Sequence, residues 1–205
     1  MNVLSSIPLS FCGTDARTCW AFFQGTSMSS PHTAGSAAVV IDAFVTRSFD
    51  SYTAEQVRSA ITNTAEQGVL TSYTDGTTKV SDVNIVGAGQ VDLDSAVLAK
   101  VGVGPVSTSF GAVPSGSGQT LTKSVSLSSL TGTQQSLRVS LDDPADAADF
   151  RAPATTVTIP ATGTTQISVS VVLPKGASAG DYEADLNLSS GAVEVAHSVL
   201  YVHIK

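Results

Sequence analysis

The spacing of hydrophobic residues changes near position 104. Before it, apolar residues mostly recur every three or four positions, which is the spacing of one face of an α-helix. After it, apolar and polar residues alternate, as they do along a strand with one buried face. The change of period predicts two domains, at residues 1–104 and 105–205.

The most apolar stretch before this boundary follows Pro31. Its apolar residues are Ala34, Ala37, Ala38, Val39, Val40, Ile41, Ala43 and Phe44. They cover nearly every face of a helix, which predicts a helix buried in a large core. Pro31 suits the first turn of that helix, where its missing N–H has no partner to lose.

Further elements before residue 104 have local signals. Thr53-Ala54-Glu55-Gln56 is a capping-box pattern, and apolar residues at helical spacing follow it, so a second helix is expected there. A last helix is expected at about 92–100, a short strand at 2–7, and a turn at Asp75-Gly76.

Seven alternating runs follow residue 105, separated by clusters of Gly, Pro, Ser and Asp. They lie at 106–110, 121–127, 137–141, 155–159, 166–173, 182–188 and 193–204. Seven short strands in about 100 residues predict a β-sandwich. In the fifth run, Ile167, Val169, Val171 and Leu173 are expected to face the core.

The overall composition is that of a folded protein, with 42% hydrophobic and 13% charged residues. The net charge is −7, and the ten Lys and Arg residues form no cluster. A nucleic-acid partner is therefore not expected, because binding to phosphates needs clustered cations. No apolar run is long enough to cross a bilayer, so no membrane span is expected.

Ser27 is the candidate nucleophile. It lies in Gly25-Thr26-Ser27-Met28-Ser29-Ser30-Pro31, between a glycine and the start of the apolar helix. An attacking serine needs an N–H aimed at the developing oxyanion, and the start of a helix offers unpaired N–H groups. It also needs a base to take its proton.

The segment GTSMSSPHTAG at 25–35 resembles the serine signature of the subtilases, the subtilisin-like serine peptidases, over eleven consecutive positions. Gly87-Ala88-Gly89-Gln90-Val91-Asp92 resembles the closing stretch of the same catalytic domain. The resemblance implies an α/β fold class: the C-terminal part of a subtilisin-like three-layer fold, mostly helical here. Gly180-Asp181-Tyr182 resembles the start of a late strand in fibronectin type III-like and immunoglobulin-like domains, and subtilases often carry such a domain after the catalytic one. The resemblance implies an all-β, fibronectin type III-like sandwich at 105–205.

The resemblance also implies roles for particular residues. Subtilases use Asp, His and Ser, with an oxyanion-hole Asn, and only the serine, Ser27, has a counterpart in this chain. His32 belongs to the serine motif itself and is interpreted as structural, while His197 and His203 are interpreted as ordinary residues of the sandwich. The chain is therefore expected to be a peptidase fragment that is inactive alone.

The expected partners are a protein or peptide substrate and the missing N-terminal part of the catalytic domain. No cofactor and no metal site are expected, since no acidic cluster has EF-hand spacing. The richness in Ser and Thr and the low number of Lys favour a secreted, extracellular protein.

Two further features precede the serine. Cys12 and Cys19 are close enough for one disulfide in an oxidising compartment, although two buried thiols remain an alternative. Trp20, Phe22 and Phe23 would lie near the substrate cleft of a subtilase, but packing is the role we expect for them.

A different class of function is also open. Residues 105–205 could form a non-catalytic binding or stabilising module attached to the remnant of a peptidase. Only Phe110, Phe150, Tyr182 and Tyr201 are aromatic there, too few for an obvious carbohydrate-binding surface.

Overall fold

The computed structural model describes residues 3–12, 19–72, 74–114, 116, 118–144 and 147–205. The chain separates into two compact units, Met1–Val39 and Val40–Lys205. Each unit is described by itself.

The first unit contains a β-hairpin. Strand β1 (Val3–Ser6) pairs antiparallel with β2 (Trp20–Phe23), and a short 3₁₀ helix, η1 (Leu9–Phe11), follows β1. The predicted strand at 2–7 is therefore present, and Asn2 lies outside the described residues. The first part of helix α1 (Thr26–Thr46) completes this unit.

Helix α1 begins right after Gly25, whose φ of +126° is a conformation that few other residues adopt. The helix fully buries only Val40 and Phe44, while Val39 and Val45 are about half exposed. The prediction of a helix buried on nearly every face is therefore wrong. Pro31 lies in the second turn of α1, later than predicted, so one helical hydrogen bond is missing there.

The second unit contains three short helices, α2 (Ala54–Thr62), α3 (Val83–Val86) and α4 (Leu93–Val97). The capping box predicted for α2 is confirmed, since Thr53 accepts from the Gln56 N–H and the Gln56 side chain accepts from the Thr53 N–H. The turn at Asp75-Gly76 is also confirmed, with Gly76 at φ +67°. Helix α4 is shorter than the predicted last helix.

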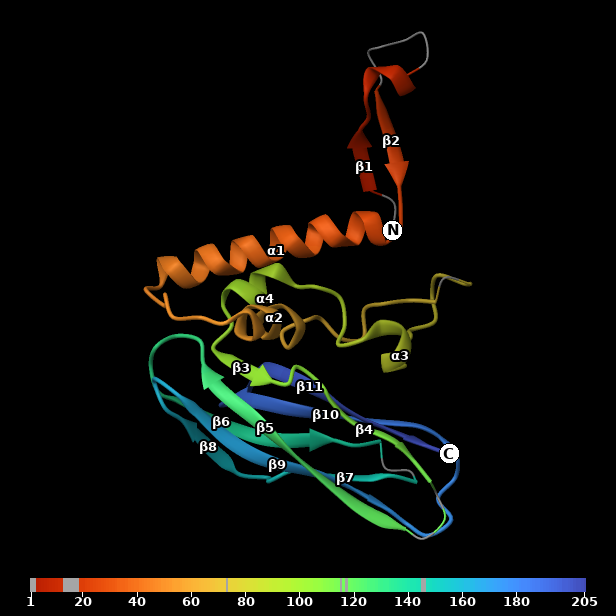
Figure 1. The fold of residues 1–205 in the computed structure, drawn as a ribbon, viewed down its shortest axis with the longest axis vertical. Coiled ribbons are helices and arrows are strands. Elements are labelled where there is room, and N and C mark those ends of the chain that lie inside the picture. The colour runs from red at the N-terminus through yellow and green to blue at the C-terminus, as the bar shows by residue number, and fades with distance from the viewer. Residues whose placement is uncertain (1–2, 13–18, 73, 115, 117, 145–146) are drawn as a thin grey trace. The chain divides into compact units, whose positions relative to one another are not determined.

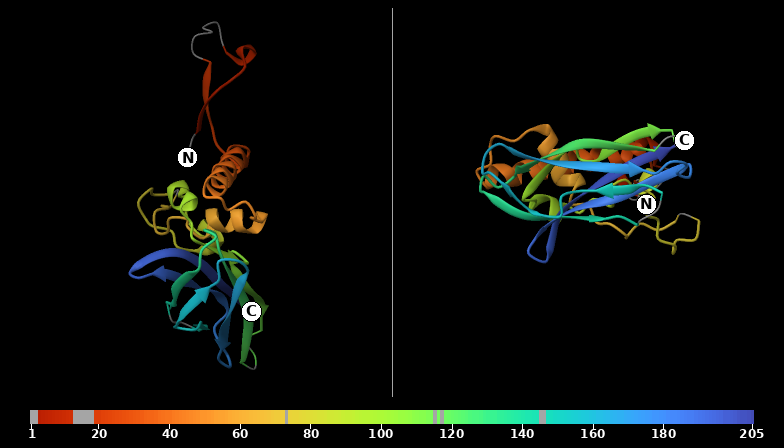
Figure 2. Two further views of the ribbon diagram at one scale, coloured as in Figure 1. Left: turned by 90° about the vertical axis from the view of Figure 1, so that its left-hand side faces the viewer. Right: turned by 90° about the horizontal axis from the view of Figure 1, so that it is seen from below.

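The second unit also contains two facing β-sheets (Figures 1 and 2). One has the strand order β4-β11-β10-β6-β8, and the other has β3-β5-β9-β7. The strands are β3 (Val101–Gly104), β4 (Thr108–Val113), β5 (Gln119–Ser129), β6 (Gln135–Asp142), β7 (Asp149–Arg151), β8 (Thr156–Ile159), β9 (Thr164–Leu173), β10 (Gly180–Ser190) and β11 (Val193–Ile204).

Each of the seven predicted runs overlaps one of these strands. The inward positions of β9 are also confirmed: Ile167, Val169, Val171 and Leu173 are buried in the common core of the two sheets. Strands β3, of four residues, and β7, of three, were not predicted.

The predicted fold class is wrong. Of the described residues, 42% are in strands and 22% in helices, so the chain is mostly β. The described strands before residue 101 are β1 and β2 alone, an antiparallel pair, and they do not form the parallel sheet of a three-layer α/β fold. Helices α2 to α4 are only four to nine residues long, and irregular segments connect them. The fibronectin type III-like assignment is not confirmed.

A buried polar network joins α2 to the sandwich within the second unit. The Asn63 side chain donates to the carbonyls of Val106 and His197, at 2.7 Å each, and accepts from the Ser59 hydroxyl at 2.7 Å. The Ser59 hydroxyl in turn accepts from the Val103 N–H on β3. Helix α2 packs against β3, as Figure 1 shows.

Candidate functional site

Ser27 is the second residue of α1, which places it in the first helical turn. The turn is closed by the Gly25 carbonyl, which accepts from the N–H groups of Met28 at 3.0 Å and Ser29 at 3.2 Å. Within the described residues, the Ser27 N–H and hydroxyl make no hydrogen bond, and the side chain is exposed. The serine therefore presents a free hydroxyl next to a free N–H at the positive end of a helix.

Three side chains make polar contacts with backbone carbonyls in the first turns of α1. The Ser29 hydroxyl donates to the Gly25 carbonyl at 3.4 Å, and the Thr33 hydroxyl donates to the Ser29 carbonyl at 3.0 Å. The His32 ring lies with Nδ1 2.6 Å from the Met28 carbonyl oxygen. Pro31 has no N–H to donate to the Ser27 carbonyl, so one helical hydrogen bond is missing there. The three side-chain contacts stabilise the helix on both sides of the missing bond.

His32 is not placed to act as the base for Ser27. Five residues along an α-helix correspond to a rotation of about 140°, so the two side chains leave α1 on different faces. A carbonyl can only accept, so Nδ1 carries a proton in its contact with Met28. The interpretation of His32 as a structural residue is consistent with this geometry.

The strands before the serine expose large apolar side chains. Trp20 is 61% exposed, Phe22 66% and Phe23 40%, and Phe11 in η1 is 78% exposed. The prediction that the aromatic residues of β2 mainly pack is therefore wrong. A hairpin of two strands is too thin to bury both of its faces.

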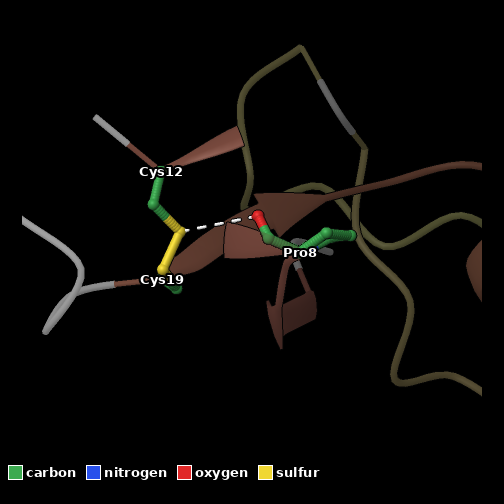
Figure 3. The surroundings of a disulfide bond; sticks show 3 residues. All are labelled: Pro8, Cys12 and Cys19. Atoms are coloured by element: carbon green, nitrogen blue, oxygen red, sulfur yellow. Dashed lines mark hydrogen bonds between the residues drawn. A yellow bond between two sulfur atoms is a disulfide. The ribbon is translucent and has the colours of Figure 1, made fainter. Parts of the chain in front are cut away.

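The two cysteines form a disulfide, Cys12–Cys19, with Cα atoms 5.3 Å apart (Figure 3). This decides between the two alternatives that the sequence left open. The Cys12 Sγ lies 3.6 Å from the Pro8 carbonyl oxygen, a contact without a proton because both sulfurs are bonded to each other. The disulfide closes the loop that joins β1 to β2.

A second group of chemically active residues lies in the other unit and was not predicted. Glu183 and Asp185 on β10 line a cavity of about 220 Å³, together with Asp142 and part of segment 67–89. Glu183 accepts from the Val83 N–H of α3 at 3.1 Å. The residues involved are about 100 positions apart in sequence, so no local pattern could have indicated them.

Burial shifts the protonation of these carboxyl groups. It raises the pKa of Glu183, an effect that the Val83 hydrogen bond opposes and that nearby Asp82, Asp185 and Asp181 reinforce. Burial also raises the pKa of Asp185, against the influence of His197 and of a hydrogen bond with Gln67.

The histidines of the sandwich have different surroundings. His203 lies 2.8 Å from Asp181, and this contact, after the Tyr201 hydroxyl bond, lowers the pKa of Asp181. His197 is a buried sandwich residue, and its Nε2 also bonds the Ala88 carbonyl at 2.9 Å. The interpretation of His197 as an ordinary strand residue missed this link to the segment after α3.

The described residues contain no candidate metal cluster and no candidate membrane-spanning helix. No three His, Cys, Asp or Glu residues among them are arranged to hold a metal ion. None of their helices is long and apolar enough to cross a membrane.

In comparison with known proteins, residues 8–112 match the model of the subtilase family. The Minor extracellular protease Vpr of Bacillus subtilis is 36% identical over 111 residues, which are 54% of this chain and 12% of that protein. The chain thus spans about an eighth of the length of the curated relative that it matches.

Solved structures give weaker likenesses. They include the Caenorhabditis elegans protein WR4, with a TM-score of 0.37, 8% identity and coverage of 52% of this chain and 99% of that one. A PapD-like domain of human CEP192 gives a TM-score of 0.36, 16% identity and coverage of 52% and 86%. Scores of this size carry no conclusion about function.

Proposed function

Since this chain belongs to the subtilase family, we propose that it carries the nucleophile of a serine endopeptidase and that Ser27 is that nucleophile. The observation that carries the proposal is the exposed Ser27 in the first turn of α1, with an unused N–H, inside the segment GTSMSSPHTAG. The family match over residues 8–112 includes this segment.

The proposed reaction is acyl transfer. The Ser27 Oγ attacks the carbonyl carbon of the scissile peptide bond while a histidine base takes its proton, and the same histidine then protonates the departing amine. The Ser27 N–H donates to the oxyanion, with a second donor from an asparagine. Water finally hydrolyses the acyl-serine and restores the free hydroxyl.

We propose that the base, its orienting aspartate and the asparagine come from polypeptide outside the 205 residues. The support is the geometry of His32, which bonds the carbonyl of its own helix and leaves α1 on a different face from Ser27. A serine without a base stays protonated at neutral pH and reacts slowly.

The test is labelling with a fluorophosphonate, which phosphonylates activated serines with loss of fluoride. The 205-residue chain alone is expected to give no label and no hydrolysis of a chromogenic peptide. A longer polypeptide is expected to take up one label. It consists of the same chain extended at its N-terminus by the residues encoded upstream of Met1, where that upstream sequence holds in-frame D-[ST]-G and H-G-T-H motifs. Stoichiometric labelling of the short chain would contradict the proposal.

We further propose that the protein is secreted. The disulfide Cys12–Cys19 supports this, because disulfides persist in oxidising compartments. The name of the relative, an extracellular protease, points the same way.

A second candidate function is stabilisation by the sandwich. The observation that favours it is the Asn63 and Ser59 network, which connects α2 to β3 and β11. In this role the sandwich acts as a non-catalytic module that holds the preceding helices.

A further inference from the structure

One strand of the sandwich carries a row of carboxylates on its outer face. Successive residues of a strand point to opposite faces, and on β10 the even-numbered Ala184 and Leu186 are buried in the core. Asp181, Glu183 and Asp185 therefore share the outer face. Two parts of segment 67–89, at 67–70 and 80–89, lie over part of this row, because residues of both parts line one cavity with Glu183 and Asp185.

Segment 67–89 makes few direct contacts with the carboxylates of β10. The Val83 N–H donates to Glu183 at 3.1 Å, and Gln67 bonds Asp185. On the neighbouring strand β11, His197 bonds the Ala88 carbonyl. One end of the segment is thus held to the sheet at Gln67, and the other end is held at Val83 and Ala88.

Space remains between segment 67–89 and the sheet. The cavity of about 220 Å³ adjoins a second one of about 300 Å³, and both are lined by Ser81, Pro144 and Glu183. These carboxyl groups are thus only partly removed from water, and protons can reach them.

The charges around Glu183 and Asp185 are mostly negative. The carboxylates lining the two cavities are Asp82, Asp142, Asp143, Asp181, Glu183 and Asp185. The ionisable groups on β11 are His197, which pairs with Glu194 at 3.4 Å, Tyr201 and His203, both bonded to Asp181. In segment 67–89, Lys79 bonds the Val69 carbonyl of its own loop.

We propose that segment 67–89 is a pH-sensitive latch that closes on β10 when Glu183 and Asp185 are protonated and loosens when both are ionised. Protonation removes two of the negative charges that crowd this interface. Opening the latch returns both carboxylates to water, which favours their ionised form.

The direction of the pH dependence follows from the linkage between proton binding and closure of the latch. Burial raises the pKa of both groups in the closed state, so the closed state binds more protons than the open one. Their contribution to closure is complete below the ordinary carboxyl range, near pH 4, and is lost as the pH rises through the raised values. The latch is therefore weaker at neutral than at mildly acidic pH.

Hydrogen exchange of the 205-residue chain tests the latch. Peptides from 67–89 are compared at pH 5.0 and 7.5 after correction for intrinsic exchange, with peptides from β5 as the internal reference. The wild-type latch is expected to lose protection at pH 7.5 by about threefold or more relative to β5. An unchanged ratio would overturn the proposal.

The variant Glu183→Gln with Asp185→Asn keeps the size of both side chains and one acceptor oxygen on each, and it removes both charges. It is expected to be protected equally at the two pH values and better than wild type at pH 7.5. The control Asp50→Asn changes an exposed carboxyl outside both cavities and is expected to behave as wild type. A double variant that retains the pH dependence would overturn the proposal.

A second measurement covers the case in which the double variant fails to fold. Titration of the side-chain carboxyl carbons by NMR in the wild-type chain is expected to give midpoints for Glu183 and Asp185 above those of exposed carboxyl groups. Ordinary midpoints for both would overturn the latch.

Discussion

At the residue scale, the side-chain amide of Asn63 links three parts of the second unit. Its NH₂ group donates to backbone carbonyls 43 and 134 positions away in sequence, and its oxygen accepts from Ser59. Asn63 is fully buried, so none of these bonds can be exchanged for one to water. Removing the amide leaves the His197 carbonyl without this donor.

We predict that Asn63→Ala lowers the free energy of unfolding by about 2–3 kcal/mol, because a buried polar group loses its partner. Denaturant unfolding of the chain measures this change. The control is Gln134→Ala, which removes an exposed amide from the sandwich and is expected to change the unfolding free energy by less than about 0.5 kcal/mol. Equal effects of the two substitutions would contradict the role given to Asn63.

The residues that could be predicted from sequence are those whose signal is local. Ser27 stands in a contiguous motif, and Thr53 and Gln56 are three positions apart. Asn63, His197 and Glu183 acquire their surroundings only when distant segments meet. Their contacts span about 100 positions or more, and hydrophobic spacing holds no information about such pairs.

At the scale of elements, α2 begins at a capping box formed by residues close together in sequence. The helix is only nine residues long, too short to be stable in isolation. Its capping box satisfies N–H groups at the first turn, and its buried face includes Val57, Ala60 and Ile61. The cap and the packing therefore act together.

We predict that Thr53→Ala destabilises the chain by about 1 kcal/mol, because the Gln56 N–H loses its acceptor. Thermal melting followed by circular dichroism measures the effect. Thr53→Ser keeps the hydroxyl and is expected to melt close to wild type. A loss in the serine variant as large as in the alanine variant would show that the cap is not the cause.

Strands were predicted better than the arrangement of the helical part. Alternation marks a half-buried strand directly, as in β9, where the inward residues follow one another at every second position. The apolar stretch after Pro31 correctly predicts a helix but not its surroundings, since Val39 and Val45 stay exposed. Periodicity reports which residues can be buried, while burial itself depends on what covers them.

At the scale of the whole molecule, the compact unit at Val40–Lys205 crosses the domain boundary predicted at residue 104. Strand β3, at Val101–Gly104, pairs with β5 in one sheet of the sandwich. The segment before it supplies Ser59 and Asn63 to the same interface. The position of the boundary stays a prediction.

We predict that residues 40–205 melt cooperatively and at a higher temperature than residues 105–205. A cut at 105 removes β3 and exposes the edge of β5, and it also removes the Asn63 bonds. Differential scanning calorimetry of the two chains measures the difference. Equal melting temperatures would show that the sandwich is independent of the helices and would contradict the stabilising role.

The central claim is that Ser27 is the nucleophile of a subtilase. The most direct measurement is peptide mapping of the serine that a fluorophosphonate modifies in the longer polypeptide, since Ser29 and Ser30 stand beside Ser27 in the same turn. The account predicts one adduct, on Ser27, and its loss together with peptide hydrolysis in Ser27→Ala but not in Ser30→Ala. An adduct on Ser29 or Ser30, or hydrolysis that survives Ser27→Ala, would contradict it.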